Sequence, residues 1–341
     1  MKICDRLTLG SSLTEENMVF MKQLGVNSIT VGFGEKKQNR PTQNYPGIKL
    51  LDSPCFETSD LVALREWVES YGLELSGIGS RLFPRYEKIL LGQTGRDEQI
   101  DNWNKSLRNM GKAGIPQLMY IYSIDAGAKL PIWRTSSENV GRGGTKIVRF
   151  NFEVAKKTPL TRYGEISEAT LWDSLTYFLK AVIPIAEEAS VKMVLHPDDP
   201  QVPSLAGIAR IIRSTESFDR VFRIMPNEAN AMVFCLGCFA QMMDNEHVYK
   251  AIKHFGSEGR IGYVHFRGVT GTLKKFDEVF PDEGKLDMLQ AVKVLKEVGF
   301  NGVVRIDHAP ELTGDTEYGH RSHAFQIGYL KGILQGASAM E

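Results

Sequence analysis

The chain has few cysteines, no net charge and no long hydrophobic run. Four cysteines in 341 residues, Cys4, Cys55, Cys235 and Cys238, do not make a disulfide framework, so we expect reduced thiols. Lys plus Arg and Asp plus Glu balance at 41 each, without a basic stripe that would indicate nucleic acid. Apolar runs stay below the roughly 18–20 residues that span a bilayer. The first residues, MKICDRLTLGSSLTEEN, lack a signal-peptide core. We therefore expect a soluble cytoplasmic protein with neither nucleic-acid nor membrane partners.

The sequence also lacks a glycine-rich phosphate-binding turn, since TLGSSLTEEN is not GxGxxG and no Walker-type sequence occurs. It has instead short apolar runs that alternate with longer amphipathic ones. The strand candidates are 2–10, 26–34, 73–80, 115–123, 191–200, 222–237, 260–268 and 301–310. The segments between them are 14–25, 58–72, 96–114, 168–190, 203–215, 244–259 and 286–300, most with helical spacing. In the segment 58–72, Thr58, Ser59 and Asp60 predict the N-cap and Gly72 the C-cap.

Strict alternation of strands and helices favours a parallel sheet covered by helices. Eight such units in this length predict a (β/α)₈ TIM barrel, with residues 1–341 as a single domain. A doubly wound open sheet is the competing architecture, and the missing glycine-rich turn counts against it. A long insertion, residues 125–168, follows the fourth strand, and its stretch 145–152 alternates like one arm of a hairpin. The insertion is either a surface loop or a lid, and Trp133 with Arg134 favours a lid over the site.

The last four strand candidates each end in a side chain that can bind a metal. These residues are His196, Cys235, His265 and Asp307. In a barrel, the carboxyl ends of neighbouring strands meet at the rim where active sites form. Imidazole, thiolate and carboxylate together suit Mn²⁺, Fe²⁺, Co²⁺ or Zn²⁺ better than Mg²⁺ or Ca²⁺, which prefer oxygen ligands.

Two neighbouring features allow more than one interpretation. Cys238 forms a C-x-x-C spacing with Cys235; we favour a small buried residue at the head of the next helix over a redox or second-ligand role. Asp198 and Asp199 in HPDDP either orient His196 as hydrogen-bond acceptors or are solvated turn residues.

Several motifs, in this order, resemble the mannonate dehydratase family of hexuronate breakdown. They are HPDDP, FCLG, HFR and DH, together with LELSGIGS, GGTKIVRFN and AFQIGYLKGIL. The resemblance covers most of the chain and departs from the family pattern in four places, one of which is a compressed segment after the eighth strand. The first strand keeps Arg6 without the usual Trp-aromatic-Gly, Cys238 replaces a usual Ser, and Thr316-Glu317-Tyr318 replaces Pro-Gly-Tyr.

The resemblance implies a metal-dependent TIM barrel that binds a Mn²⁺-type ion through His196, Cys235, His265 and Asp307. It also implies an acid–base pair, His308 and Tyr318, without deciding which is acid and which is base. The activity that follows is dehydration of a sugar acid, D-mannonate to 2-keto-3-deoxy-D-gluconate plus water, by a hydro-lyase. Such a reaction removes the C2 proton beside a carboxylate and expels the C3 hydroxyl, which needs one base and one acid.

Three arginines are candidates for binding the substrate carboxylate, because a guanidinium binds it bidentately: Arg134, Arg267 and Arg321. Arg267 follows His265 by two residues, so both side chains leave an extended strand on the same side. His320 and His323 reach the rim from the segment after the eighth strand, or His323 packs at a helix start. The alternatives are a metal-dependent sugar isomerase or epimerase on the same barrel, or a barrel that binds a sugar acid without turnover. We expect a homo-oligomer with a small sugar acid as its ligand.

Overall fold

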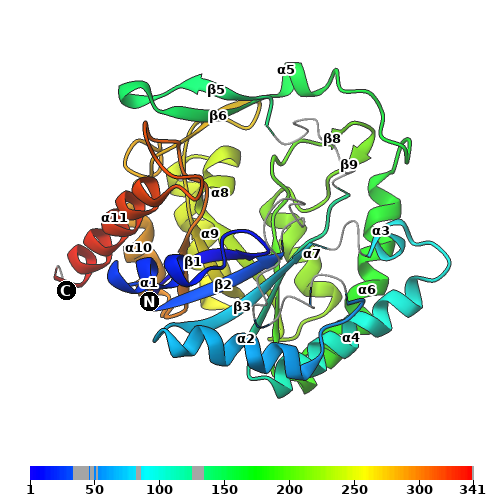
Figure 1. The fold of residues 1–341 in the computed structure, drawn as a ribbon. Helices are drawn as coiled ribbons and strands as arrows, with labels where there is room; N and C mark the ends of the chain where they lie inside the picture. The colour runs from blue at the N-terminus through cyan, green and yellow to red at the C-terminus, as the bar shows by residue number, and fades with distance from the viewer. Residues whose placement is uncertain (34–45, 47–49, 51–52, 82–85, 125–133, 340–341) are drawn as a thin grey trace.

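The chain folds around a closed barrel of eight parallel strands, and Figure 1 shows the helices outside it. The computed structural model describes residues 1–33, 46, 50, 53–81, 86–124 and 134–339. The barrel strands are β1 (Lys2–Leu9), β2 (Ser28–Phe33), β3 (Glu74–Arg81), β4 (Gln117–Ile121), β7 (Lys192–His196), β10 (Asn230–Cys235), β11 (Ile261–Phe266) and β14 (Val303–Ile306). They close in the order β1-β14-β11-β10-β7-β4-β3-β2. The predicted TIM barrel is confirmed, and the open sheet is excluded.

Helices connect successive barrel strands. They are α1 (Glu15–Gln23), α2 (Thr58–Ser70), α3 (Glu87–Leu91), α4 (Arg96–Lys112), α5 (Phe152–Ala155), α6 (Glu168–Glu188), α7 (Thr215–Ile224), α8 (Leu236–Met242), α9 (Asn245–Ser257), α10 (Met288–Glu297) and α11 (His320–Ala339). The helix α6 illustrates how sequence fixes them: the Ser167 hydroxyl accepts a hydrogen bond from the Thr170 N–H and so caps the first turn. One face of α6, including Leu171, Leu175 and Phe178, is buried against the barrel. None of the described helices combines the length and hydrophobicity needed to cross a bilayer.

The barrel core explains why its strands are short apolar runs. Every residue of β10 and β11 is buried, as expected for parallel strands covered on both faces. Side chains from five strands fill the interior in a separate cluster. They are Cys4, Val194, Val233, Tyr263 and Val303. The barrel is therefore a packed core whose chemistry is confined to its mouth.

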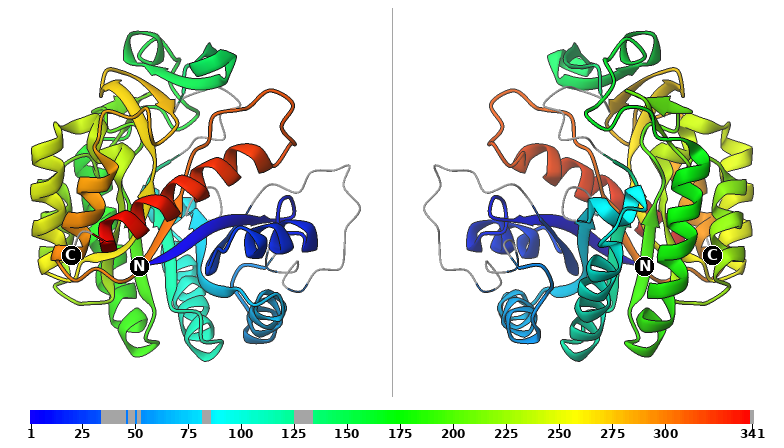
Figure 2. Two further views of the ribbon diagram at one scale, coloured as in Figure 1. Left: turned by 90° about the vertical axis from the view of Figure 1, so that its left-hand side faces the viewer. Right: turned by 90° about the vertical axis from the view of Figure 1, so that its right-hand side faces the viewer.

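A four-stranded antiparallel sheet joins the insertion to the segment after β11. Its order is β12 (Gly268–Thr272), β13 (Lys275–Val279), β6 (Lys146–Asn151) and β5 (Ser136–Val140). The predicted hairpin arm is confirmed as β6, which pairs with β5 on one side and β13 on the other. Figure 2 shows this sheet and the loop after β14 on the same upper side of the molecule. Residues 125–133, with Trp133, lie outside the described residues, as does Gly34 at the end of the second strand candidate.

Three sequence predictions need correction. The candidate strand 222–237 began too early, because Phe222–Ile224 finish α7 and β10 begins at Asn230. The preceding segment 203–215 contains the short pair β8 (Ser204–Leu205) and β9 (Ile208–Ala209), since Gly207 has a φ of +86° that favours a tight turn. Glu57 occupies the N-cap position of α2 without a side-chain capping hydrogen bond, so Thr58, Ser59 and Asp60 fall inside the first turn, and the C-cap is Tyr71 rather than Gly72.

Candidate metal and acid–base site

The four predicted metal ligands converge at one mouth of the barrel. His196 ends β7, Cys235 ends β10, His265 is the penultimate residue of β11, and Asp307 directly follows β14. Cys235 is in register with His265, and His265 is in register with Arg305 of β14. Because these strands are neighbours in the barrel, their carboxyl ends deliver all four side chains to the same rim.

Donor atoms in this cluster lie close enough to share one cation. Two overlapping triplets, His196–Cys235–Cys238 and Cys235–His265–Asp307, each have donor atoms within 4.8 Å of one another. The Nε2 atom of His196 also lies 3.2 Å from Nδ1 of His265. Cys238 is fully buried in α8, as predicted. The residues thus offer the imidazole, thiolate and carboxylate donors that suit a divalent transition ion.

The surroundings favour the ionised forms of the thiol and the carboxylate. Burial by itself raises the pKa of Cys235, but hydrogen bonds with Cys238 and His196 outweigh burial and hold this pKa well below its ordinary value. Burial also opposes ionisation of Asp307, while the neighbouring His265, His308 and Arg305 hold its pKa well below the usual range. Metal ligands bind in their deprotonated forms, so this electrostatic environment fits a cation site.

The backbone, rather than a carboxylate, orients His196. Its Nδ1 atom lies 2.7 Å from the carbonyl oxygen of Pro197. Within the described residues, Asp198 and Asp199 form hydrogen bonds to groups other than His196, and neither is a solvated turn residue. Asp198 is buried and accepts a hydrogen bond from the Ile212 N–H at 2.8 Å. Asp198 and Asp199 in HPDDP therefore neither orient His196 nor lie in solvent, so both interpretations drawn from the sequence are wrong.

Asp199 belongs to a buried network of two carboxylates and two arginines. Its Oδ2 atom lies 2.7 Å from an amino nitrogen of both Arg134 and Arg267. The Oε1 atom of Glu278 lies 3.1 Å from Arg267 Nη2 and 2.9 Å from Arg134 Nε. Gly237 leaves the necessary space, since an added Cβ would lie 2.9 Å from Nε of Arg267. Two of the predicted substrate-binding arginines are thus already paired with acidic side chains.

Arg267 also faces the ligand cluster, as the two-residue spacing from His265 predicts. Its Nη1 atom lies 4.0 Å from Cys235 Sγ and 4.0 Å from Asp307 Oδ2. The side chain is fully buried, and its positive charge stands beside the thiolate and the carboxylate. It therefore reduces the repulsion between these two anionic groups.

Sequence reasoning missed a second arginine in the same place, Arg305. Its Nη2 atom lies 2.6 Å from Nε2 of His265 and 2.8 Å from Oδ1 of Asp307. The side chain is buried. Arg305 precedes Asp307 by two residues in an extended strand. Because side chains alternate between the two faces of a strand, this spacing in the sequence could have placed Arg305 on the same side as Asp307.

His308 is the more exposed of the two predicted acid–base residues, with 46% of its side chain accessible. Its Nδ1 atom lies 2.6 Å from Oε1 of Glu278. Burial opposes ionisation of Glu278, but the neighbouring His308 and Arg134 lower its pKa to about 2, so Glu278 is an acceptor. Nδ1 of His308 therefore donates to Glu278, and Nε2, which lies 3.8 Å from Oδ2 of Asp307, is the ring nitrogen left to take up a proton. No motif in the sequence singles out Glu278, which comes from β13.

Tyr318, the other predicted acid–base residue, contacts the first strand. Its hydroxyl donates a hydrogen bond to Oδ2 of Asp5 at 3.2 Å. The same oxygen lies 2.6 Å from Nδ1 of His323, whose ring stacks on that of Tyr318 with centroids 4.5 Å apart. Burial and the Asp5 carboxylate raise the pKa of Tyr318 well above its ordinary value. Tyr318 is thus a protonated phenol at neutral pH.

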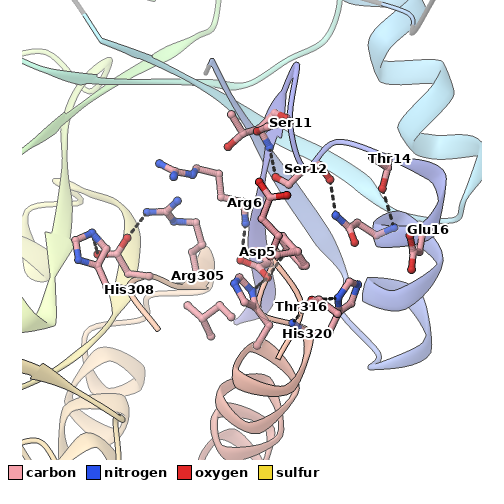
Figure 3. A pocket seen from close by; sticks show the side chains of 17 residues that line it. Asp5, Arg6, Ser11, Ser12, Thr14, Glu16, Arg305, His308, Thr316 and His320 are labelled. Carbon is pink, nitrogen blue, oxygen red and sulfur yellow. Dashed lines mark hydrogen bonds and ion pairs between the residues drawn. The ribbon is translucent and has the colours of Figure 1, made fainter. Parts of the chain in front are cut away.

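A cavity of about 550 Å³ brings the acid–base residues together beside the ligand cluster. Asp307, His308 and Tyr318 all line it, as does Arg305. Figure 3 shows the remaining wall, formed by β1 and the loop that leads to α1. Its polar side chains include Arg6, Thr8, Ser11, Ser12 and Thr14. A cavity with hydroxyl and charged walls suits a polyhydroxylated anion better than an apolar ligand.

His320 lines the cavity, whereas the adjacent Arg321 does not. Arg321 is exposed, donates to the Thr313 carbonyl at 3.1 Å and lines a separate hollow with Arg142 and Phe325. The structure therefore does not bring Arg321 to the cavity. His320 lines the cavity and meets the Tyr318 ring edge-on, with centroids 5.2 Å apart.

Comparison with known proteins points to one family. The family model for D-mannonate dehydratase (UxuA) matches residues 21–158 and 150–341. The mannonate dehydratase of Streptococcus agalactiae serotype Ia is 33% identical over 297 residues, which cover 80% of this chain and 84% of the relative. That of Oceanobacillus iheyensis is 30% identical over 313 residues, with the same two coverages of 80% and 84%.

Solved structures agree on the fold. The crystal structure of mannonate dehydratase from Streptococcus suis serotype 2 is similar over 100% of this chain and 94% of its own, with a TM-score of 0.84 and 27% identity. D-Psicose 3-epimerase from Clostridium cellulolyticum H10 has a TM-score of 0.64, with coverages of 98% and 99%. Its identity of 12% limits that likeness to the barrel itself.

Proposed function

We propose that this chain, which belongs to the D-mannonate dehydratase family, removes water from D-mannonate to form 2-keto-3-deoxy-D-gluconate. One observation carries the proposal: ligand-type side chains from four barrel strands meet beside a polar cavity that also holds His308 and Tyr318. The reaction needs a cation near the substrate carboxylate, a base for the C2 proton and an acid for the C3 hydroxyl. The residues around this cavity can supply each of these.

We propose His196, Cys235, His265 and Asp307 as the ligands of one divalent ion. The donor distances and the ionised state of Cys235 and Asp307 support this set. Such an ion, when bound, stabilises negative charge that develops on the substrate carboxylate. Mn²⁺ is the expected ion, with Fe²⁺, Co²⁺ and Zn²⁺ as the other candidates for this mixed donor set.

We propose that His308 is the base that removes the C2 proton. The hydrogen bond between Nδ1 and Glu278 fixes the ring and leaves Nε2, 3.8 Å from Oδ2 of Asp307, as the nitrogen that accepts the proton. Half of the side chain is accessible and lines the cavity, so a substrate reaches it. The adjacent ligand Asp307 places this base next to the cation site, where the acidified C2 position would lie.

We propose that Tyr318 is the acid that protonates the departing C3 hydroxyl. The raised pKa keeps its phenol protonated at neutral pH, so it can donate a proton but cannot accept one as a phenolate base. Tyr318 comes from the segment before α11, whereas His308 follows β14, and both line the same cavity. This arrangement divides the two proton transfers between two side chains.

For the substrate carboxylate, Arg305 joins the arginines predicted from the sequence. Arg305 lines the cavity and touches the ligand Asp307, so a carboxylate near the cation would meet its guanidinium. The roles of Arg134 and Arg267 stay predictions, since each already pairs with two carboxylates. The role of Arg321 also stays a prediction, and its separate hollow counts against it.

We propose that residues 1–341 act as one barrel domain whose insertion, 125–168, covers the site. Two contacts support this role: β6 of the insertion pairs with β13, which carries Glu278, and Arg134 reaches Glu278 directly. Cytoplasmic location and assembly into a homo-oligomer stay predictions.

The decisive experiment removes the metal and restores Mn²⁺, Fe²⁺, Co²⁺, Zn²⁺ or Mg²⁺ singly. Each form is tested on a panel of hexonates for a 2-keto-3-deoxy product. We expect product from D-mannonate with Mn²⁺ or another transition ion, and little with Mg²⁺. His308→Asn should lower kcat by about 10²-fold or more with metal content unchanged. If every pair of metal and hexonate yields no product, the dehydratase proposal fails, and isomerised sugars or binding without turnover would identify the alternative.

A further inference from the structure

Asp5 is a buried carboxylate that the reaction outlined above leaves without a role. Only 1% of the residue is exposed, and it lies on β1 at the edge of the cavity. Its Oδ1 atom accepts the backbone N–H of Arg6 at 2.7 Å. Its Oδ2 atom accepts from two side chains, Tyr318 at 3.2 Å and His323 at 2.6 Å. One carboxylate oxygen therefore connects the proposed acid to a histidine.

We propose that Asp5 and His323 are positioning residues that resupply Tyr318 with the proton it gives to the leaving hydroxyl, an inference that rests on the proposed function. Asp5 bridges the two rings from the strand side, and the stacking of His323 on Tyr318 holds them in fixed relation. The three groups come from both ends of the chain, with Asp5 and His323 separated by 318 positions in the sequence.

The proton transfers balance without another reactant. The C3–O bond breaks, and the Tyr318 proton combines with the departing hydroxide to form water. The Nδ1 proton of His323 then passes through Asp5 to restore the phenol. His308 releases the C2 proton to solvent, and solvent returns one proton to His323, so a turnover neither gains nor loses protons.

The charged groups around His323 favour this order of proton transfers. Burial by itself lowers the pKa of His323, but the carboxylates of Asp5 and Asp315 raise it above its ordinary value. Arg6 opposes the effect from β1. The neighbouring His320 faces the Tyr318 ring edge-on and hydrogen-bonds Thr316 through Nδ1 at 2.5 Å. Among the described residues, the charged or titratable groups that line the same cavity also include Glu16 of α1, Glu317, Arg305, Asp307 and His308.

The pH profile of the metal-loaded enzyme tests the proposal. If imidazolium at position 323 feeds the acid, kcat/KM falls as pH rises through the pKa of His323. Asp5→Asn removes the charge that raises this pKa, so this alkaline limb should move to lower pH. We also expect kcat to fall about 10- to 100-fold, with KM within about threefold, because the acid step rather than substrate binding is impaired.

His323→Phe is a second variant that tests the proposal even if Asp5→Asn does not fold. Phenylalanine keeps the ring against Tyr318 but carries no proton, so the alkaline limb due to His323 should disappear. The matched control is Asp219→Asn, which removes the partner of the exposed His254 at 2.8 Å, away from the cavity. This control should leave both the rate and the profile unchanged. A profile that keeps its alkaline limb in Asp5→Asn and His323→Phe would overturn the proposal, whatever the loss in rate.

A measurement without substrate separates this inference from the proposed function. Proton–nitrogen NMR follows the titration of the His323 imidazole in the wild-type protein and in Asp5→Asn. A lower His323 pKa in the variant supports the coupling even if no hexonate is dehydrated. An unchanged His323 pKa, in a protein that does dehydrate D-mannonate, overturns the inference and leaves the dehydratase assignment intact.

Discussion

The Nδ1 atom of His308 lies 2.6 Å from Oε1 of Glu278, a carboxylate that comes from β13 of the added sheet rather than from a barrel strand. The same oxygen binds Arg134 at the start of the β5–β6 hairpin segment. The added sheet therefore supplies the carboxylate that holds Nδ1 of the proposed base. A histidine whose Nδ1 is held by an ionised carboxylate presents Nε2 as an acceptor in one orientation.

Glu278→Gln should lower kcat because the amide can hold either tautomer of His308. We expect a loss of roughly 10²-fold with unchanged metal content, measured by steady-state kinetics and by metal analysis of the same samples. Asp277→Asn is the matched control, since Asp277 is adjacent in β13 but pairs with Arg149 at 2.6 Å. Equal losses in the two variants would mean that Glu278 supports the sheet rather than the base.

Cys235→Ser should release the metal, whereas Cys238→Ser should retain it. The two substitutions are chemically identical and lie three residues apart in the same buried environment. Only Cys235 belongs to both donor triplets, so its loss should lower metal affinity at least about 10-fold. The metal content per polypeptide chain after dialysis, measured by mass spectrometry, checks this. Loss of metal in Cys238→Ser alone would reverse the assignment of the two thiols.

Arg134→Met should destabilise the fold by about 3–5 kcal/mol, because it leaves Asp199 and Glu278 buried with one counter-charge fewer. Arg149→Met, which breaks the more exposed pair with Asp277, should cost about 1 kcal/mol or less. Chemical denaturation of both variants at neutral pH measures the difference. Equal costs would show that the buried network is not what secures the insertion.

The sequence predicted the barrel mouth better than its surroundings. Apolar runs and strand–helix alternation located the barrel strands, and that order alone places His196, Cys235 and His265 on one rim. The same reasoning failed for residues 222–224, where a Phe-Arg-Ile stretch that alternates like a strand is the end of an amphipathic helix. A short apolar run fits a strand or a helix end equally well.

The missed residues share a different physical cause. Asp5 meets His323 across 318 residues, and Glu278 meets His308 across 30, so no local period marks either contact. Asp5 interrupts the apolar face of Ile3 and Leu7 in β1, and Glu278 follows Phe276 on one face of β13, but neither pattern identifies the partner of the carboxylate. Only the closure of the barrel and the pairing of β13 with β6 bring these groups to the histidines. Tertiary pairing therefore decides which charged residues serve the site.

The pH dependence of stability should report the charge on Glu278. Its folded pKa is lowered from 4.5 to about 2, so its stabilising contribution is complete above the unfolded value and is lost as pH falls through the folded value. That shift corresponds to stability on the order of 3 kcal/mol at neutral pH. The difference in unfolding free energy between wild type and Glu278→Gln should stay constant from about pH 7 to 5 and shrink below about pH 4.5. Denaturant titrations across this range measure it. A difference that is the same at pH 3 and pH 7 would show that shape, rather than ionisation, accounts for the cost of the substitution.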